Sequence, residues 1–227
     1  MAKNIHLAPP TFDWAHTAST GEIPEGMMLI EDSIPFHIIE RKNIIVESIG
    51  KERPGLRLTG VFQRGNEKNA NGRIYVQEVL TAAVAQLQEA INERRVMGEF
   101  DHPPDAKIHM DRVSHLLTRL WMEGVVCYGE MEVIKGMPCG DMLACLVESG
   151  VQVGISSRGV GDMEMTMHEG EEAYEVMPGF AFVTFDAVAE PSVTGTQLMV
   201  MESRQKKMKK HLLISRKLTL LINRLFY

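Results

Sequence analysis

Few cysteines and no long apolar run occur in this sequence, and both shortages limit what the protein can be. Three cysteines are an odd number and lack the spacing of a metal or redox motif, which argues against a disulfide framework. We interpret them as small core residues. No apolar stretch reaches the roughly 18 residues that a membrane-spanning helix requires. Residues 1–21 also lack the basic region and apolar core of a secretory signal. We therefore expect a protein of a reducing compartment without a membrane span.

Positive charge is scarce outside one short segment. The net charge is −6, but residues 203–227 hold eight Lys or Arg and no acid. The rest of the chain therefore has 16 basic against 30 acidic residues, a net charge of −14. With 44% hydrophobic residues the chain can bury one core of ordinary size. We divide it into an irregular, proline-containing arm at 1–50, one domain at 51–202 and a basic tail at 203–227.

The basic tail has the pattern of an amphipathic helix, because its apolar residues fall on one helical face and basic residues lie off it. The apolar positions are Ile214, Leu218, Leu221 and Leu225. Such a helix can bind a partner helix, a membrane surface or nucleic acid, and the alternative is a frayed, solvated extension. Since the tail has no aromatic stacking pattern, we expect no direct role in nucleic-acid binding.

Hydrophobic periodicity predicts about seven strands and two substantial helices. The surest helix is at 77–96, where apolar residues share one face. These residues are Leu80, Val84, Leu87 and Ile91. A shorter helix is expected at 141–148, with Asp141 as its N-cap. Strands are expected at 56–62, 113–121, 125–134, 151–156, 163–167, 174–177 and 180–188, with one edge strand in the arm. The pattern predicts an α+β fold with an antiparallel sheet or barrel core flanked by helices.

The segment Gly-Ile-Ser-Ser-Arg-Gly at 154–159 places two hydroxyls between glycines that permit tight backbone geometry. The residues leading into it alternate in polarity, as in a half-buried strand. On this alternation Ser157 shares the apolar face with Ile155, and Ser156 lies on the open face. A nucleophile must reach a substrate, so Ser156 is the candidate. The alternative is a polar end of a strand with no catalytic role.

Two further residues would complete a nucleophilic site. The prolines at 103 and 104 exclude helical geometry at His102 and place it on a fixed loop. Asp186 interrupts the apolar run at 180–188, and a buried carboxylate requires a partner. A serine nucleophile needs a base to take its proton and a third group to orient that base. The alternatives are a turn histidine and an acid that binds only backbone N–H groups.

A second histidine-containing segment has the spacing His-x-Asp-x-x-x-His, at His109, Asp111 and His115. These residues could bind the metal of a metal-dependent hydrolase. No cysteine lies nearby, and the three would be divided between a loop and a strand. We therefore prefer to interpret them as a polar segment leading into a strand, and we expect no metal and no other cofactor.

Four blocks occur in one order within residues 56–192. They are Asn-x-Asn-Gly-Arg-x-Tyr at 69–75, Gly-Glu-Phe-Asp-His-Pro-Pro at 98–104, Gly-Ile-Ser-Ser-Arg-Gly at 154–159 and Asp-Ala-Val-x-x-Pro-Ser at 186–192. On these blocks the chain resembles the prohead (procapsid maturation) serine proteases of large tailed myoviruses, which are related in fold to the herpesvirus assemblins. The resemblance covers more than half of the chain and implies a herpesvirus-protease-like fold.

The resemblance implies roles for individual residues. His102 is the implied general base and Ser156 the implied nucleophile. Asp186 follows the serine in the chain, as the second histidine of the assemblins does, and is the expected third member. The competitors for that third place are His115, Glu99 and Asp111. The candidates for stabilising the oxyanion are backbone N–H groups at an expected turn formed by Arg158 and Gly159.

The resemblance also implies a function. Family members cleave scaffold or core proteins and the major capsid protein precursor inside the immature head, typically after Glu in an aliphatic-x-Glu pattern, and they process themselves. The self-cleavage candidates of this form are Glu31, Glu40, Glu47 and Glu202. Cleavage after Glu202 would release the tail, which we expect to be a propeptide or a scaffold-docking helix. We expect a homo-oligomer, made as a precursor in the host cytoplasm and active inside the prohead.

A binding module is the alternative to an enzyme. It would be a non-catalytic capsid-assembly or scaffold-binding protein on the same fold, with the basic tail as its working part. Such a module has no need for His102, Ser156 and Asp186 together, so their joint presence favours the endopeptidase.

Overall fold

The computed structural model describes residues 12–35, 40–46 and 51–189. The chain divides into two units, Met1–Val193 and Thr194–Tyr227. The second unit, with the predicted tail helix and Glu202, lies outside the described residues. Among the residues that are described, no helix is long and apolar enough to cross a membrane.

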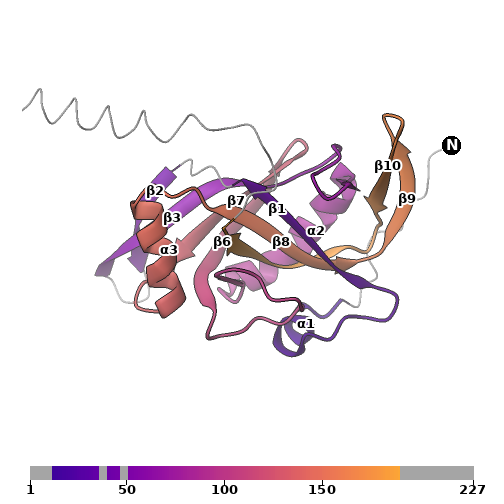
Figure 1. Cartoon of the computed structure of the whole chain (residues 1–227). Helices are drawn as coiled ribbons and strands as arrows, with labels where there is room; N and C mark the ends of the chain where they lie inside the picture. The colour runs from indigo at the N-terminus through magenta and orange to yellow at the C-terminus, as the bar shows by residue number, and fades with distance from the viewer. Residues whose placement is uncertain (1–11, 36–39, 47–50, 190–227) are drawn as a thin grey trace, which may run out of the picture. The chain divides into compact units, whose positions relative to one another are not determined.

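Helices and strands are interleaved along the described chain (Figure 1). The helices are α1 (Trp14–Thr20), α2 (Gln77–Asn92) and α3 (Pro138–Glu148). The strands are β1 (Met28–Pro35), β2 (Glu40–Val46), β3 (Lys51–Arg64), β4 (Arg73–Tyr75), β5 (Met97–Glu99), β6 (Val113–Glu123), β7 (Val126–Val133), β8 (Gly154–Gly161), β9 (Met163–His168), β10 (Glu171–Val176) and β11 (Ala181–Val188).

The strands form three sheets. One sheet has the order β2-β3-β7-β6-β5, and the other two have the orders β1-β8-β11 and β4-β10-β9. The pairing is antiparallel except between β10 and β4. Figure 1 shows β1 and β8 running together in front of α2, with the β9–β10 hairpin at one end. The predicted α+β class, with a mostly antiparallel sheet core and flanking helices, is confirmed.

The main core lies between α2 and the strands β6 and β11. The four apolar positions that predicted α2 are all buried in it. Aromatic rings extend the core across the sheets, with ring centroids 5.0 Å apart for Phe62 and Phe185 and 4.8 Å apart for Phe182 and Phe185. Burying each large side chain of this kind stabilises the fold by about 1.5–3 kcal/mol. The core therefore fixes the position of β11, the strand that carries Asp186.

The segment predicted as an irregular arm is more regular than expected. It contains α1, whose N-cap Asp13 accepts a hydrogen bond from the His16 N–H at 3.0 Å. It also contains β1, which pairs with β8 along its whole length and forms the edge of that sheet, so the edge strand expected in the arm is present. The strand is hard to predict because Asp32 occupies a buried position between Ile30 and Ile34, where the alternation should show an apolar residue.

The helix predicted at 141–148 begins three residues earlier, at Pro138. Proline is favoured in the first turn of a helix, because its missing N–H would be unpaired there. The N-cap is therefore Met137, without a side-chain cap, and the prediction that Asp141 caps the helix is wrong. Asp141 instead accepts a hydrogen bond from the Gly136 N–H at 2.9 Å.

Candidate active site

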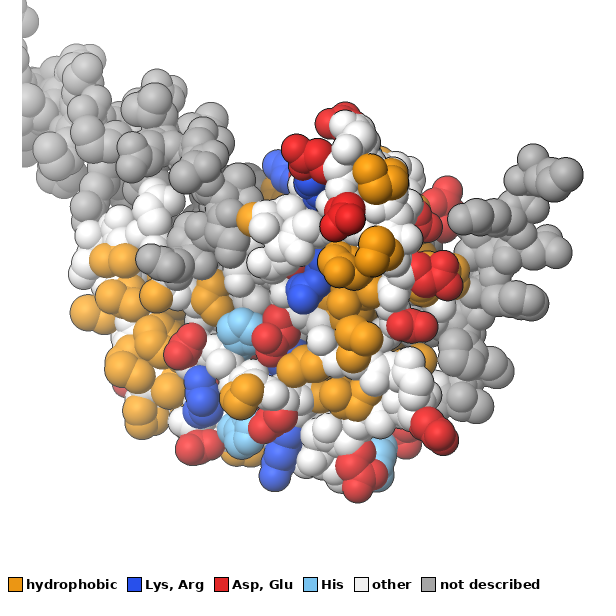
Figure 2. Space-filling model, turned by 45° about the vertical axis from the view of Figure 1, so that its right-hand side comes forward, with side chains coloured by type: hydrophobic (Ala, Val, Ile, Leu, Met, Phe, Trp, Pro, Cys, Tyr) orange, Lys and Arg blue, Asp and Glu red, His pale blue; other side chains and the backbone are white. Residues whose placement is uncertain are grey.

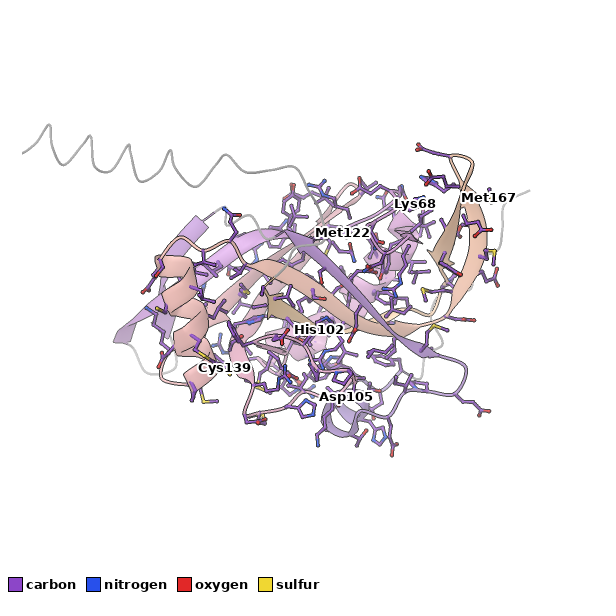
Figure 3. All side chains as sticks on the ribbon, viewed as in Figure 1. Lys68, His102, Asp105, Met122, Cys139 and Met167 are labelled. Carbon is purple, nitrogen blue, oxygen red and sulfur yellow. The ribbon has the colours of Figure 1, made fainter. Side chains whose placement is uncertain are left out.

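The middle strand β8 brings distant chain segments to one place. In the β1-β8-β11 sheet Ser156 lies opposite Ser33 of β1 and Asp186 of β11. His102 comes from the loop after β5 and lies beside these strands (Figure 3). On the face shown in Figure 2, histidine and acidic side chains lie next to one another between areas of hydrophobic side chains. The fold thus gathers the serine, histidine and aspartate that the sequence singled out.

The two adjacent serines have different partners. The Ser156 Oγ lies 3.5 Å from the His102 Nε2. The Ser157 hydroxyl accepts a hydrogen bond from the Gln63 Nε2 at 3.1 Å and donates one to the Asp32 carbonyl at 3.3 Å. The two serines therefore lie on opposite faces of the strand, as predicted. The expectation that the face of Ser156 is open is wrong. Both serines are buried, because β8 lies between two strands and is covered on both faces.

The loop of His102 is tied to the strand of Asp186. Phe100 pairs with Ala187, and the Asp101 N–H donates to the Ala187 carbonyl at 2.7 Å. Asp101 has a φ of 62°, a left-handed conformation that aspartate tolerates better than most residues. The chain turns sharply there, and the Asp101 carboxylate accepts the His102 N–H at 3.1 Å. The backbone therefore fixes the position of the imidazole relative to β11.

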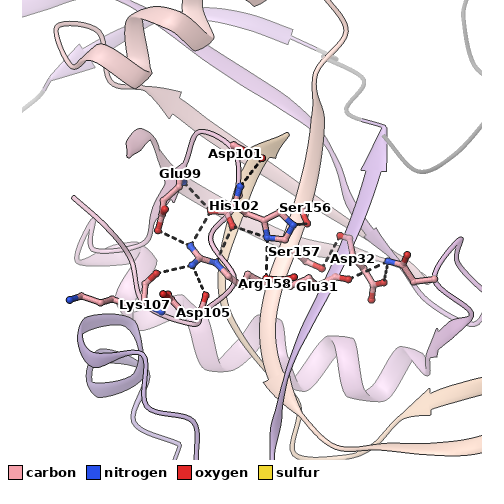
Figure 4. A network of polar contacts seen from close by, with 12 residues as sticks. Glu31, Asp32, Glu99, Asp101, His102, Asp105, Lys107, Ser156, Ser157 and Arg158 are labelled. Atoms are coloured by element: carbon pink, nitrogen blue, oxygen red, sulfur yellow. Dashed lines mark hydrogen bonds and ion pairs between the residues drawn. The ribbon is translucent and has the colours of Figure 1, made fainter. Parts of the chain in front are cut away.

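Arg158 is completely buried beside this loop and links several parts of the site (Figure 4). Its guanidinium donates to the Glu99 carboxylate at 3.0 Å and contacts both oxygens of Asp186, at 3.2 and 3.0 Å. It also donates to the carbonyls of Asp105 and Lys107, at 2.9 and 2.7 Å. Arg158 therefore holds the loop after His102 against the middle strand.

Asp186 is engaged mainly by Arg158. Its Oδ1 also accepts the Glu99 N–H at 3.0 Å, while its Oδ2 lies 4.0 Å from the His102 Nδ1. Burial raises the pKa of the Asp186 carboxyl to about 6, against the opposing effects of the Arg158 charge and the Glu99 N–H. The predicted third member thus lies near the imidazole, but at a longer distance than a hydrogen bond.

Glu31 of β1 lies closer to the imidazole than Asp186 does. Its Oε1 is 3.2 Å from the His102 Nδ1. This contact is the largest of the effects that raise the pKa of His102, and the charges of Glu31 and Asp186 add to it, whereas burial and Arg158 oppose it. Sequence reasoning treated Glu31 only as a cleavage site. No local pattern marks its second role, because the contact depends on the pairing of β1 with β8.

The competitors for the third place have other partners. His115 is buried, its Nε2 donates to the Phe185 carbonyl and its Nδ1 accepts from the Ser114 hydroxyl, both at 2.9 Å. Burial lowers the pKa of His115 to about 4, so its ring is neutral at pH 7. Glu99 binds Arg158, and its second oxygen lies 3.3 Å from the Arg112 Nε. Asp111 is exposed in the turn before β6.

The segment with the spacing of a metal motif does not gather its ligands. His109 contacts Glu99 and Asp105, each at 3.6 Å, whereas His115 is bound within the core as described above. Across the described ranges, no group of three or more His, Cys, Asp or Glu side chains could hold a metal ion. The segment leads into β6, as the preferred interpretation of the sequence had it.

The residues predicted to bind the oxyanion lie in a strand and not in a turn. Arg158 and Gly159 are in the middle of β8, opposite Glu31 and Ile30 of β1. A Cβ at Gly159 would lie 2.5 Å from the Phe180 ring, so the glycine allows this ring to pack against the strand. The expected turn is therefore wrong, and the role of these N–H groups stays a prediction.

The cleavage candidates and the cysteines lie in different surroundings. Glu31 is in β1 and Glu40 begins β2, whereas Glu47 and Glu202 lie outside the described residues. Of the cysteines, Cys127 is buried as expected. Cys139 on α3 is partly exposed and Cys145 is exposed, so the expectation of a core position is wrong for both. Figure 3 shows that Cys139 lies on α3.

A serine hydroxyl that faces an imidazole, with a carboxylate at the other ring nitrogen, is the arrangement by which hydrolases with an activated serine are recognised. The comparisons with known proteins agree with this class. The chain belongs to the family described as "Prohead core protein serine protease", whose model matches residues 11–205.

A curated relative and a solved structure support this assignment. The chain is 32% identical over 176 residues to the "Prohead core protein protease" of Enterobacteria phage T4, a match that covers 74% of this chain and 81% of that protein. It is also similar to the solved structure of the bacteriophage T4 capsid assembly protease, with a TM-score of 0.65 and 28% identity. That match covers 74% of this chain and 100% of the solved one.

Proposed function

We propose that this protein is a serine endopeptidase in which Ser156 is the nucleophile and His102 the general base. The observation that carries the proposal is the 3.5 Å distance from the Ser156 Oγ to the His102 Nε2. Such contacts are often longer in the absence of substrate and shorten when it binds. The Ser157 hydroxyl is already engaged in two hydrogen bonds, which supports Ser156 as the nucleophile.

The proposed reaction is acyl transfer in two halves. The Ser156 Oγ attacks the scissile carbonyl carbon while the His102 Nε2 takes the hydroxyl proton. The carbon–nitrogen bond then breaks, and His102 gives that proton to the leaving amine. Water attacks the acyl-enzyme by the same route and releases a carboxylic acid and free Ser156. Asp186 adds negative charge near the imidazolium, and backbone N–H groups at Arg158 and Gly159 are proposed to stabilise the oxyanion.

The proposed substrates are proteins of phage head assembly. The names of the relatives, a prohead core protein protease and a capsid assembly protease, support this choice. We propose cleavage of scaffold or core proteins and the major capsid protein precursor after Glu in aliphatic-x-Glu sites, within the prohead in the host cytoplasm. The chain would also process itself, most usefully after Glu202, so that residues 203–227 act as a propeptide or scaffold-docking helix.

The first test compares wild type with Ser156→Ala, with Ser157→Ala as the matched control. Intact masses are measured after incubation, together with cleavage of a peptide that contains an Ile-x-Glu site. We expect Ser156→Ala to lose at least about 10³-fold in kcat, as removal of a catalytic serine does elsewhere. Ser157→Ala should retain most of the activity and the same cleavage products.

Two results would contradict the proposal. Continued cleavage by purified Ser156→Ala would remove this serine from the mechanism. A folded wild-type chain that is inert toward the peptide, toward itself and toward a serine-reactive fluorophosphonate probe would favour the non-catalytic assembly module.

A further inference from the structure

The motif Asn-x-Asn-Gly-Arg-x-Tyr at 69–75 has no part in the proposed chemistry, but it makes specific contacts. Its first residue shapes a turn, because the Asn69 Oδ1 accepts the N–H groups of Asn71 and Arg73, both at 3.0 Å. Gly72 continues this turn with a φ of 75°, a conformation that favours glycine. The turn leads into β4, and the side chains of Asn71, Arg73 and Tyr75 point to β1.

All three of these side chains bind the buried carboxylate of Asp32. The Asp32 Oδ1 accepts from the Asn71 Nδ2 at 2.7 Å and from the Arg73 Nη1 at 3.0 Å, and the Oδ2 accepts from the Tyr75 hydroxyl. Burial, the charge of Asp32 and the hydrogen bond to it raise the pKa of Tyr75 well above its usual value, so the hydroxyl stays protonated as a donor. A carboxylate that is 1% exposed is thereby fully paired.

The same side chains also hold the backbone of the preceding residue. The Glu31 carbonyl accepts from the Asn71 Nδ2 at 3.2 Å and from the Arg73 Nη1. Successive side chains of a strand point to opposite faces. With Asp32 fixed on the motif's side of β1, the Glu31 side chain must point to the other side. That side is where His102 lies.

The contact between Glu31 and His102 matches two otherwise unpaired atoms. The Glu31 Oε1 and the His102 Nδ1 are both buried, and within the described ranges neither makes a hydrogen bond, although they lie close enough to each other for an ion pair. They lie 3.2 Å apart. The nearer oxygen of Asp186 is 4.0 Å from the same nitrogen and 3.0 Å from the Arg158 Nε.

We infer that Glu31 is the positioning residue that orients His102 through its Nδ1, and that the motif at 69–75 is a clamp that holds Glu31 in place through Asp32. The inference rests on the proposed function, since it assigns a role relative to the general base. Asp186 then serves mainly to fix Arg158. The imidazole is faced by Glu31 from β1, by Asp186 from β11 and by Arg158 from β8, whereas Asp101 on its own loop binds the His102 backbone N–H.

The inference also revises one cleavage prediction. Cleavage after Glu31 requires Ser156 to attack the Glu31 carbonyl carbon, but this carbonyl is bound by Asn71 and Arg73 and belongs to a paired strand. We therefore expect no self-cleavage after Glu31 in the folded protein.

The test removes the negative charge of Glu31 while keeping an oxygen that can accept a hydrogen bond from the His102 Nδ1–H. The base must be neutral to accept a proton from Ser156, so kcat/KM falls as the pH drops through the pKa of His102. That pKa is raised in the wild type, chiefly by Glu31. Glu31→Gln should therefore move the acid limb of the plot of kcat/KM against pH to lower pH, and it should reduce kcat by about 10²-fold or more. Glu31→Asp should keep the limb near its wild-type position.

A second measurement does not depend on activity. In the Ser156→Ala background, NMR titration of the His102 ring should give a lower pKa for Glu31→Gln and an unchanged pKa for Glu164→Gln, an exposed position on β9. Tyr75→Phe, which removes one donor from the clamp, should shift the same pKa in the same direction but less. Thermal unfolding checks that each variant folds.

The outcomes separate this inference from the proposed function. If Glu31→Gln leaves both the ring titration and the acid limb unchanged while Asp186→Asn moves them, Asp186 is the positioning residue and the inference is wrong. If the ring titration responds to Glu31 but the wild type has no activity that depends on Ser156, the contact stands and the proposed function fails.

Discussion

Arg158 has no exposed surface, and it contacts two carboxylates that are themselves buried. Isolated charges in such surroundings are strongly unfavourable, so each member of the group depends on the others. Its partners Glu99 and Asp186 lie in β5 and β11, and its carbonyl acceptors lie in the loop after His102. One side chain thus links β8 to β5, to β11 and to the loop that follows His102.

Substitution of this arginine should therefore be among the most damaging single changes. Arg158→Met leaves Glu99 and Asp186 without their shared cation, and we expect a loss of about 3–5 kcal/mol in the free energy of unfolding. Arg158→Lys keeps the charge but not the planar fork of donors, and should lose part of that amount. Urea unfolding in the Ser156→Ala background measures both. A loss below about 1 kcal/mol for Arg158→Met would mean that water or another group replaces the guanidinium.

Individual elements differ in how well the sequence predicts them. The face of α2 follows a simple periodicity, and that prediction holds. The half-buried strand predicted at 151–156 is only partly right, because β8 runs from Gly154 to Gly161 and is buried throughout; the placement of Ser156 and Ser157 on opposite faces holds. The position of β1 was not predicted, although an edge strand was expected in the arm, because a buried acid, Asp32, is stabilised by donors from a motif about 40 residues later, which no local pattern can show. The covering of β8 on both faces likewise depends on segments that are distant in the chain.

The candidate site was predicted in the same uneven way. The serine and histidine were found because glycines and prolines mark their local conformations. Asp186 was noticed because a charged residue interrupts an apolar strand. In the structure its carboxylate forms an ion pair with Arg158. Glu31 carried no such mark, since its partner His102 lies on a loop far away in the sequence and no local pattern links the two residues.

A glycine of β5 allows a close approach that a larger residue would prevent. A Cβ at Gly98 would lie 2.1 Å from the His115 Nε2 and 2.2 Å from the Phe185 carbonyl, the two atoms joined by a hydrogen bond. Gly98→Ala should therefore cost about 3 kcal/mol or more of stability and displace the adjoining loop of His102.

Gly161→Ala is the graded control for this prediction, because the nearest atoms to its Cβ are 3.1 Å away. Its thermal midpoint should fall less than that of Gly98→Ala. Equal midpoints for the two variants would show that β5 can shift without cost, contrary to the packing described here.

At the scale of the whole molecule, the described elements are followed in the sequence by a basic segment, residues 203–227. The described elements end at Val188, within the first unit, Met1–Val193. A chain that ends at Val193 should therefore unfold within about 2 °C of the full-length protein, both carrying Ser156→Ala to prevent self-cleavage. A fall of several degrees, measured by calorimetry, would show that residues 194–227 contribute to the stability of the first unit.

The pairing of β1 with β8 also determines when the candidate site can first form. Asp32 and Ser157, which lie opposite each other in these strands, are 125 residues apart in the chain. During translation β1 leaves the ribosome early and has no partner until β8 follows, and β11 comes later still. Contacts between such distant segments form slowly. A nascent chain therefore carries Glu31, His102 and Ser156 for some time before the pairing of β1 with β8 brings them together.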